Sequence, residues 1–265
     1  MSSISKLYEP RETPMQVAVF MSGSGTNAVK LLEVQKELEG GGRQAPYNIS
    51  TIVTDNYEDK NNAWRIAERF GIPSLFYSDF KEFKSHLEDP GDLGARAPYF
   101  SEVLQCLKNV ESGIDCIALA GYEIIVTEPL LSAYENMIIN VHPADLSITD
   151  ETLKRKYTGN HAVLDAILDG EPEIRASTHL VTCEVDGGPV LMISEPVTVE
   201  LPEGITLEYL RREENVEEAN GIAKAHQDKL KEVGDWRIFP KTLEHMANGE
   251  FVKYANGTVA LMIRN

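Results

Sequence analysis

Short apolar runs alternate with helical segments through the first half of this sequence, and this alternation constrains the fold more than any other feature. The segment 114–120 is almost continuously apolar, as expected for a strand buried on both faces of a parallel sheet. Strands are predicted at 16–20, 47–54, 73–77, 114–120 and 137–141, and helices at 28–38, 62–70 and 98–110. Such an order requires right-handed strand–helix–strand crossovers. We therefore predict an α/β, Rossmann-like fold, a mostly parallel open sheet with helices on both faces.

The second half of the sequence has a different pattern. Residues 177–185 and 189–197 predict an antiparallel hairpin, and residues 251–254 and 258–263 predict another around an Asn-Gly turn. Helices are expected at 161–168, at 207–232 with an interruption near Gly221, and at 236–246, and a polar excursion with a short helix at 144–158. We divide the chain into an N-terminal tail (1–14), one catalytic domain (15–250) and a C-terminal hairpin extension (251–265).

The charge balance limits the partners of the chain. It has 42 acidic and 25 basic residues, a net charge of −17, whereas nucleic acids are bound through basic surfaces. We also expect no membrane contact, because no apolar window reaches a transmembrane length and the first residues are polar. Cys106, Cys116 and Cys183 have no metal-ligand spacing, and they predict reduced thiols in a cytoplasmic protein without a bound metal.

A glycine-rich loop, 22–27, follows the first apolar run and opens the first helical segment. Unpaired N–H groups at a helix N-terminus form an anion site. The loop lacks the lysine of a Walker loop, and Ala28 occupies the last glycine position of the dinucleotide fingerprint. The sequence therefore favours a monophosphate as the ligand.

Asn140 and His142 occupy alternate positions at the end of the last apolar run, so they point to the same side of a strand. Asn140 can donate to a developing negative charge, and His142 titrates near neutral pH. Asp186 adds a carboxylate on a glycine-softened turn. These are the groups that acyl transfer to an amine requires. We expect Asp186 to raise the pKa of His142, so that a protonated His142 holds the oxyanion together with Asn140. His179, on the first strand of the predicted hairpin, is interpreted as structural, with a place near the pocket as the alternative.

Four motifs together resemble the phosphoribosylglycinamide formyltransferase family: the glycine loop and residues 119–122, 140–143 and 185–190. The resemblance covers residues 15 to 250 and implies the formyltransferase fold. It also implies transfer of a formyl group from 10-formyltetrahydrofolate, the co-substrate, to the primary amine of glycinamide ribonucleotide in purine biosynthesis. No metal is implied, and the small-molecule substrates are the implied partners.

The resemblance also implies a role for each matching position. Asn140, His142 and Asp186 are similar to the catalytic residues of the family. Gly25, Thr26 and Asn27 match the phosphate loop, and Arg96 and Asp235 match residues that bind the glycinamide substrate and its ribose hydroxyls. The folate positions are Ile124, Ile125 and Val126, which hold the pterin ring, and Thr182, Cys183, Glu184 and Val185, which close over it.

Departures from the family pattern flank the expected substrate cleft. Residues 144–147 differ from the usual sequence, a longer stretch precedes Gly159, and Tyr122-Glu123-Ile124 replaces a more apolar and basic sequence. Four alternatives therefore stay open: formylation of another phosphorylated amine, hydrolysis of 10-formyltetrahydrofolate, formylation of a nucleotide sugar or of methionyl-tRNA, and a non-catalytic nucleotide- or folate-binding protein. The oligomeric state is open too, a homodimer included.

Overall fold

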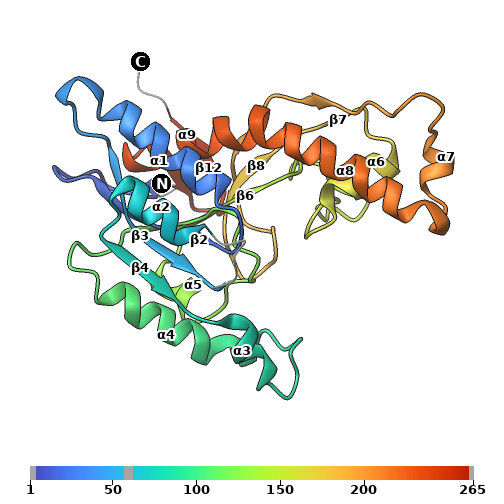
Figure 1. The fold of residues 1–265 in the computed structure, drawn as a ribbon. Helices are drawn as coiled ribbons and strands as arrows, with labels where there is room; N and C mark the ends of the chain where they lie inside the picture. Colours follow the sequence, from blue (N-terminus) through green and yellow to red (C-terminus); the bar gives the residue numbers. More distant parts are fainter. Residues whose placement is uncertain (1–3, 57–61, 263–265) are drawn as a thin grey trace.

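A seven-stranded sheet forms the centre of the computed structural model, which describes residues 4–56 and 62–262. The strand order is β4-β3-β2-β5-β6-β8-β9 (Figure 1). The first five strands pair in parallel, whereas β8 is antiparallel to both β6 and β9, so the predicted mostly parallel sheet is confirmed. The strands are β2 (Met15–Met21), β3 (Tyr47–Thr54), β4 (Ser74–Tyr77), β5 (Cys116–Leu119), β6 (Ile138–His142), β8 (Ser177–Leu180) and β9 (Val190–Ile193).

Helices cover both faces of this sheet, because the central strands are apolar on both sides. Val17 and Val19 of β2 pack into one buried cluster and Ala18 and Phe20 into another, following the two-residue period of a strand. The first face is covered by α1 (Thr26–Leu38), α2 (Ala63–Phe70) and α9 (Trp236–Ala247); the second by α3 (Phe80–Ser85), α4 (Ala97–Lys108) and α5 (Leu130–Ala133).

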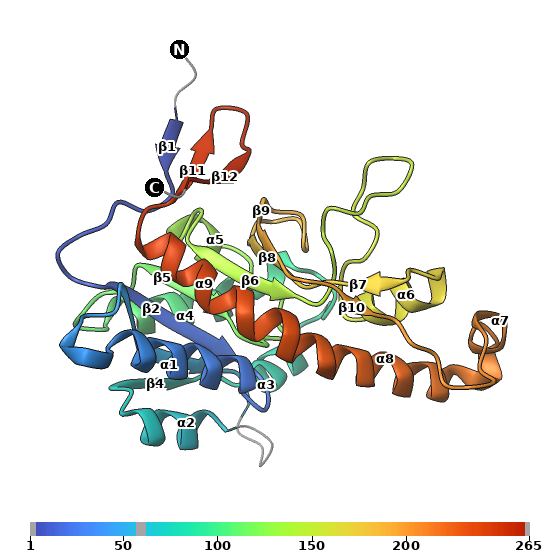
Figure 2. The same cartoon turned by 90° about the horizontal axis from the view of Figure 1, so that it is seen from above.

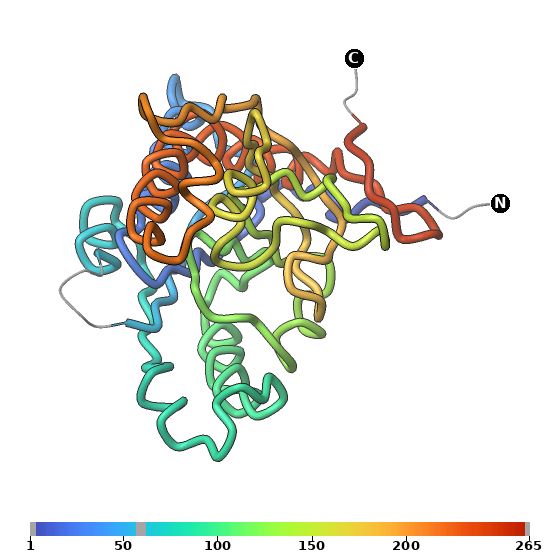
Figure 3. Tube along the Cα trace, turned by 90° about the vertical axis from the view of Figure 1, so that its right-hand side faces the viewer, coloured from blue at the N-terminus to red at the C-terminus, as the bar shows by residue number. Residues whose placement is uncertain are grey.

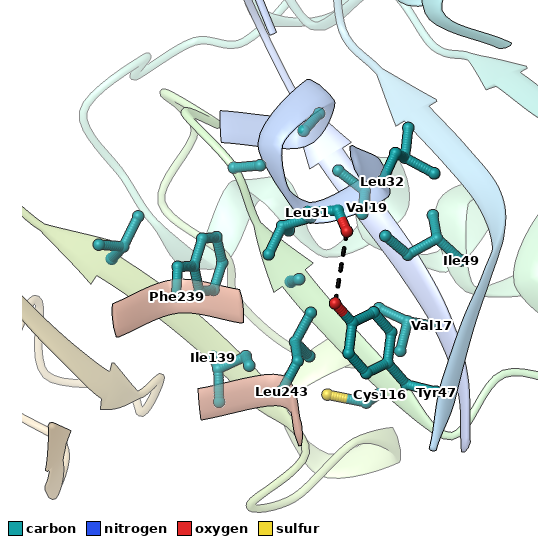
Figure 4. Close-up of a cluster of buried hydrophobic side chains, with 14 of the residues drawn as sticks. Val17, Val19, Leu31, Leu32, Tyr47, Ile49, Cys116, Ile139, Phe239 and Leu243 are labelled. Carbon is teal, nitrogen blue, oxygen red and sulfur yellow. Dashed lines mark hydrogen bonds between the residues drawn. The ribbon is translucent and has the colours of Figure 1, made fainter. Parts of the chain in front are cut away.

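The first face shows why the helices are fixed in position (Figure 4). Leu31 of α1 and Phe239 and Leu243 of α9 are almost wholly buried against the strands. The hydroxyl of the buried Tyr47 donates to the backbone carbonyl of Leu31 at 3.3 Å, which satisfies its one polar group. α1 and α9 therefore meet side by side above β2, and both begin at the same end of the sheet as the carboxyl end of β6.

A lobe extends beyond that end of the sheet (Figure 2). It contains α6 (Ala162–Asp169), α7 (Leu207–Leu210), α8 (Val216–Leu230) and the paired β7 (Glu173–Ile174) and β10 (Val197–Thr198). The predicted helix at 207–232 is broken at 211–215, where a 3-10 turn intervenes, and it continues through Gly221. One glycine costs a helix about 1 kcal/mol, which the packing of α8 against α6 outweighs.

Residues 231–235 form a π-helical turn that joins α8 to α9, so the two helices make one long rod (Figure 2). The turn packs closely against the sheet. A Cβ on Gly234 would lie 2.9 Å from the Cβ of Ala176, and therefore only glycine fits there without a shift. Among the described residues, no helix is both long and apolar enough to cross a bilayer.

Residues 144–158 contain no helix, contrary to the prediction. The chain doubles back on itself through a bridge between Thr149 and Arg155, and Asp150 Oδ1 accepts from the backbone N–H groups of Thr152 and Lys154. An aspartate that binds the backbone in this way stabilises a turn in preference to a helix. We call residues 144–158 the hook segment.

The C-terminal hairpin is present as β11 (Phe251–Tyr254) and β12 (Val259–Leu261), as predicted, although the expected strand end at Ile263 lies outside the described residues. β1 (Ile4–Lys6), assigned above to the N-terminal tail, pairs antiparallel with β11. The resulting three-stranded sheet stands at one side of the molecule (Figure 3). Phe251 joins it to the main core, where its side chain is fully buried.

Candidate active site

Two adjoining cavities lie at the carboxyl end of β6, where the parallel part of the sheet gives way to the antiparallel part. The first has a volume of about 470 Å³ and the second about 130 Å³. Asn140 and His142 line both cavities, which is the consequence of their alternate positions on one strand. The edge of an open α/β sheet beyond the carboxyl ends of its strands is where ligands of such folds bind.

Asp186 is brought to the same place by the turn between β8 and β9. Its Oδ2 accepts from the backbone N–H of Gly159 at 2.8 Å and lies 3.6 Å from Nδ1 of His142. The side chain of Asp186 is only 9% exposed, and its backbone adopts a positive φ of 52°, which non-glycine residues rarely do. The three predicted catalytic side chains therefore converge.

The pKa of His142 is lowered from its ordinary value of 6.5, although Asp186 acts to raise it, as expected. Burial is the largest cause, because it disfavours the charged imidazolium, and it outweighs the opposing attraction of Asp186. Burial also acts against ionisation of Asp186, but contacts with His179, His142 and the Gly159 N–H prevail and lower its pKa to about 2. At neutral pH the pair is therefore a neutral imidazole beside a carboxylate.

The hydrogen bonds of His142 fix which nitrogen carries the proton in that state. Nε2 lies 3.0 Å from the backbone carbonyl of Tyr157, and because a carbonyl can only accept, Nε2 is the donor. Nδ1 is left without a proton and faces Asp186 at 3.6 Å. The pair can therefore receive one proton, and the resulting imidazolium would be stabilised by the carboxylate.

His179 belongs to the site, although the sequence led us to interpret it as structural. Its Nδ1 donates to the backbone carbonyl of Leu180, and its Nε2 lies 3.3 Å from Nδ2 of Asn140 and 3.5 Å from Oδ1 of Asp186. Without a proton, Nε2 accepts from the Asn140 carboxamide and orients it; with a proton, it donates to Asp186. The signal for this was the register: Asn140 and His179 stand opposite each other on β6 and β8.

The glycine loop, assigned above to a phosphate, lines the first cavity with residues 23–27. Gly25 has a φ of 71°, and a Cβ there would lie 2.5 Å from Ile66 and 2.7 Å from Met21, so the turn requires glycine. Thr26 begins α1, which directs the first N–H groups of the helix toward the cavity. Lys231, which sequence reasoning missed, is the single lysine or arginine among the described residues that line either cavity.

Asp235 lies deeper in the first cavity and is 4% exposed. Its Oδ2 accepts from Nδ2 of Asn27 at 3.2 Å, while Oδ1 has no hydrogen-bond partner. Trp236 Nε1 donates to Oδ1 of Asn27 and holds that carboxamide in place. Burial raises the pKa of Asp235 to about 6, against the weaker opposing effects of Asn27 and Lys231.

Asp235→Asn is expected to stabilise the fold at pH 8. The folded pKa of about 6 exceeds the ordinary 3.8, so the folded state binds the proton more tightly and ionisation at high pH destabilises it by about 3 kcal/mol. Asparagine does not ionise, so above pH 6 the variant should have a higher Tm than the wild type. This difference in Tm should disappear as the pH falls to about 4. Thermal melts across this range measure it, and an advantage independent of pH would contradict the assignment.

Apolar and polar side chains share the lining of the second cavity. It includes Ile124, Ile125 and Val126 together with Thr182, Glu184 and Val185, which were assigned above to folate. Two predicted residues do not reach either cavity. Cys183 is exposed. Arg96 is buried: its Nη1 donates to the carbonyl of Ile125 at 3.3 Å, and its guanidinium lies over the ring of Phe80. No group of three potential metal ligands occurs among the described residues.

Comparison with known proteins assigns this arrangement to a class. The sequence profile of the family described as Formyl transferase matches residues 15–225. The phosphoribosylglycinamide formyltransferase of Escherichia coli K12 is 36% identical over 180 residues, which are 67% of this chain and 71% of that protein. The chain therefore belongs to the phosphoribosylglycinamide formyltransferase family.

Two further relatives agree. A crystal structure of glycinamide ribonucleotide transformylase 1 from Symbiobacterium toebii has 26% identity and a TM-score of 0.64, and the match covers 96% of each chain. The trifunctional purine biosynthetic protein adenosine-3 of Gallus gallus is 28% identical over 235 residues, 89% of this chain. The chain spans only 11% to 19% of the length of the trifunctional relatives that it matches.

Proposed function

We propose that this chain transfers the formyl group of 10-formyltetrahydrofolate to the primary amine of glycinamide ribonucleotide, a step of purine biosynthesis. The observation that carries the proposal is the convergence of Asn140, His142 and Asp186 where the two cavities adjoin. A formyl donor in one cavity and an amine in the other would meet at these three side chains. Family membership and the names of the relatives support the choice of substrates.

The chemistry follows from the protonation states of the site. The substrate amine attacks the formyl carbon, and Asn140 donates to the oxyanion that develops. The attacking nitrogen loses a proton to the neutral His142, and Asp186 stabilises the imidazolium that forms. The bond from the formyl carbon to the folate nitrogen then breaks, and that nitrogen takes up the proton. The products are the formylated amine and tetrahydrofolate.

The two cavities suit the two substrates. In the first, the N-terminus of α1 and Lys231 can hold the phosphate, and Asp235 contributes to the wall beside which the ribose would lie. In the second, Ile124, Ile125 and Val126 offer an apolar surface to the pterin ring. The backbone N–H and C=O groups of this segment could also form hydrogen bonds with the polar edge of the ring.

An assay of the purified chain tests the proposal. Tetrahydrofolate release from 10-formyltetrahydrofolate is followed with glycinamide ribonucleotide, with other phosphorylated primary amines, and without an amine. We expect turnover to depend on glycinamide ribonucleotide. Turnover without an amine would instead establish a hydrolase, turnover with another amine would change the acceptor, and absence of turnover in every arm would favour a binding protein.

Substitution of Lys231 by glutamine is expected to raise the KM for the phosphorylated amine about 10-fold, because a charge-assisted hydrogen bond contributes about 1.5–3 kcal/mol. The KM for folate and kcat should change little. Lys229→Gln, two residues away and exposed, is the matched control. Glycinamide riboside without the phosphate should show no difference between wild type and variant; a difference of equal size with that substrate would argue against phosphate binding by Lys231.

We also infer a cytoplasmic location, as expected for a chain of this chemistry. It is supported by Cys106, Cys116 and Cys183, which are all free thiols although they differ in exposure. Oxidising compartments would favour disulfides among exposed cysteines.

A further inference from the structure

The hook segment, which departs from the family pattern, contacts the active site at two points. The backbone carbonyl of Tyr157 accepts from Nε2 of His142, and the guanidinium of Arg155 reaches the turn that carries Asp186. No residue of this segment was assigned a role from the sequence. The contact made by Arg155 has the more specific geometry, because it involves two hydrogen bonds.

Arg155 holds two backbone carbonyls with two different nitrogens. Nη1 donates to the carbonyl of Asp186, and Nη2 donates to the carbonyl of Gly188 at 2.7 Å. A planar guanidinium presents its donors in a fixed fork, so two such bonds fix both the distance and the orientation of the carbonyls. The first of these two bonds is made to the backbone of Asp186, the proposed catalytic carboxylate residue.

The turn needs such an external restraint. Asp186 has a left-handed φ of 52°, a conformation that costs a non-glycine residue free energy. Gly187 and Gly188 follow, and glycine gives the backbone wide conformational freedom. Neither can be exchanged for a stiffer residue, because a Cβ on Gly188 would lie 2.0 Å from the carbonyl oxygen of Leu180 and one on Gly187 would lie 2.4 Å from Glu184.

The hook segment is built to present Arg155 at this place. The N–H of Lys156 donates to the carbonyl of Ile148 at 3.1 Å, and Thr149 bridges to Arg155, so the two arms of the hook restrain each other. Tyr157, which is buried, anchors the second arm through its hydroxyl, which donates to Glu171 at 2.7 Å. Arg155 itself lines neither cavity, so it cannot act by contact with substrate.

We propose that Arg155 is a positioning residue, whose two-point contact with the Asp186–Gly188 turn holds the Asp186 carboxylate against His142. This proposal deepens the proposed function, and its kinetic test rests on that function. An error of about 1 Å in the placement of a catalytic group can cost up to about 10²-fold in rate. The hook segment thus supplies a part of the catalytic geometry.

Arg155→Lys is the decisive variant, because it keeps the positive charge and removes the two-point geometry. Four groups face His142 and set its pKa besides burial: Asp186 and the Tyr157 carbonyl raise it, and His179 and Arg155 lower it. With the charge retained, a looser Asp186 would leave His142 with less stabilisation of its imidazolium. We expect the titration midpoint of His142 to move to lower pH, kcat to fall about 10-fold, and KM values to stay within about 2-fold.

Arg175→Lys is the matched control. Arg175 also donates to a backbone carbonyl, that of Ser194 at 3.1 Å, and it lies near the hook segment at Asp145, but it has no contact with the Asp186 turn. Kinetics, melting curves and NMR titration of His142 in the substrate-free protein are measured for both variants. The proposal is overturned if Arg155→Lys matches Arg175→Lys in the His142 titration, whatever its kcat.

The NMR arm separates this proposal from the proposed function. If the wild type does not formylate glycinamide ribonucleotide, the proposed function fails, whereas a downward shift of the His142 midpoint in Arg155→Lys would still support the positioning role. An unshifted midpoint would reject that role whatever the reaction is. A melting curve close to that of wild type shows that the variant is folded.

Discussion

His142→Ala will lower kcat at least about 10²-fold and leave the affinity for tetrahydrofolate almost unchanged. His142 lies where the two cavities adjoin, and its Nδ1 is without a proton at neutral pH, so in the proposed mechanism it receives the proton of the attacking amine. Loss of general-base catalysis typically costs 10²- to 10⁴-fold, and it affects the transition state more than the ground state. Steady-state kinetics and titration with tetrahydrofolate measure the two quantities.

His226→Ala is the control for burial. His226 is also buried, its Nε2 accepts from the backbone N–H of Glu200 and its Nδ1 donates to the carbonyl of Ile222, but it lines neither cavity. Its loss should lower the Tm without lowering kcat per folded molecule. Wild-type turnover in a folded His142→Ala variant would refute the mechanism.

Asp186→Asn is expected to lower kcat about 10²-fold at every pH, because the imidazolium that forms on His142 loses its counter-charge. The neutral His142 is the active form, so the wild-type rate should rise with pH through a midpoint below 6.5. Asp186 acts to raise the His142 pKa, and therefore its removal should move this midpoint to still lower pH. The pH–rate profiles of variant and wild type measure both effects.

Asp169→Asn is the matched control for Asp186→Asn. The Asp169 carboxylate also has a lowered pKa, chiefly through its hydrogen bond with Lys156, and it lines neither cavity. Its pH–rate profile should superimpose on that of the wild type. If the profile of Asp186→Asn superimposed as well, Asp186 would be a turn residue without a part in proton transfer.

The fold could be predicted largely from local pattern. Strands of a buried parallel sheet are mostly apolar, so β2 and β5 stand out in the sequence, and glycine marks the end of α2 and α6. The failures came where tertiary contacts override propensity. Gly221 does not break α8, and the hook segment satisfies its backbone through Asp150 and not through a helix.

The active site could be predicted as far as one strand or one loop carries it. Asn140 and His142 follow from the strand period, and the glycine loop from its place before a helix. Residues that join the site from elsewhere could not be found in this way. His179 depends on the register of β6 and β8, Lys231 on a π-helical turn, and the direction of the His142 pKa shift on burial.

The π-helical turn at residues 231–235 changes the directions in which α8 and α9 present their side chains relative to each other. Leu230 must face the lobe core and Phe239 the sheet core, while Lys231 and Asp235 between them must face the first cavity. A uniform helix advances about 100° per residue, which fixes the direction of every side chain relative to the others. The wider turn shifts the phase between the two halves, so each half is oriented independently. Loss of a single residue here would rotate one half against the other, a far larger disturbance than several residues added to a surface loop.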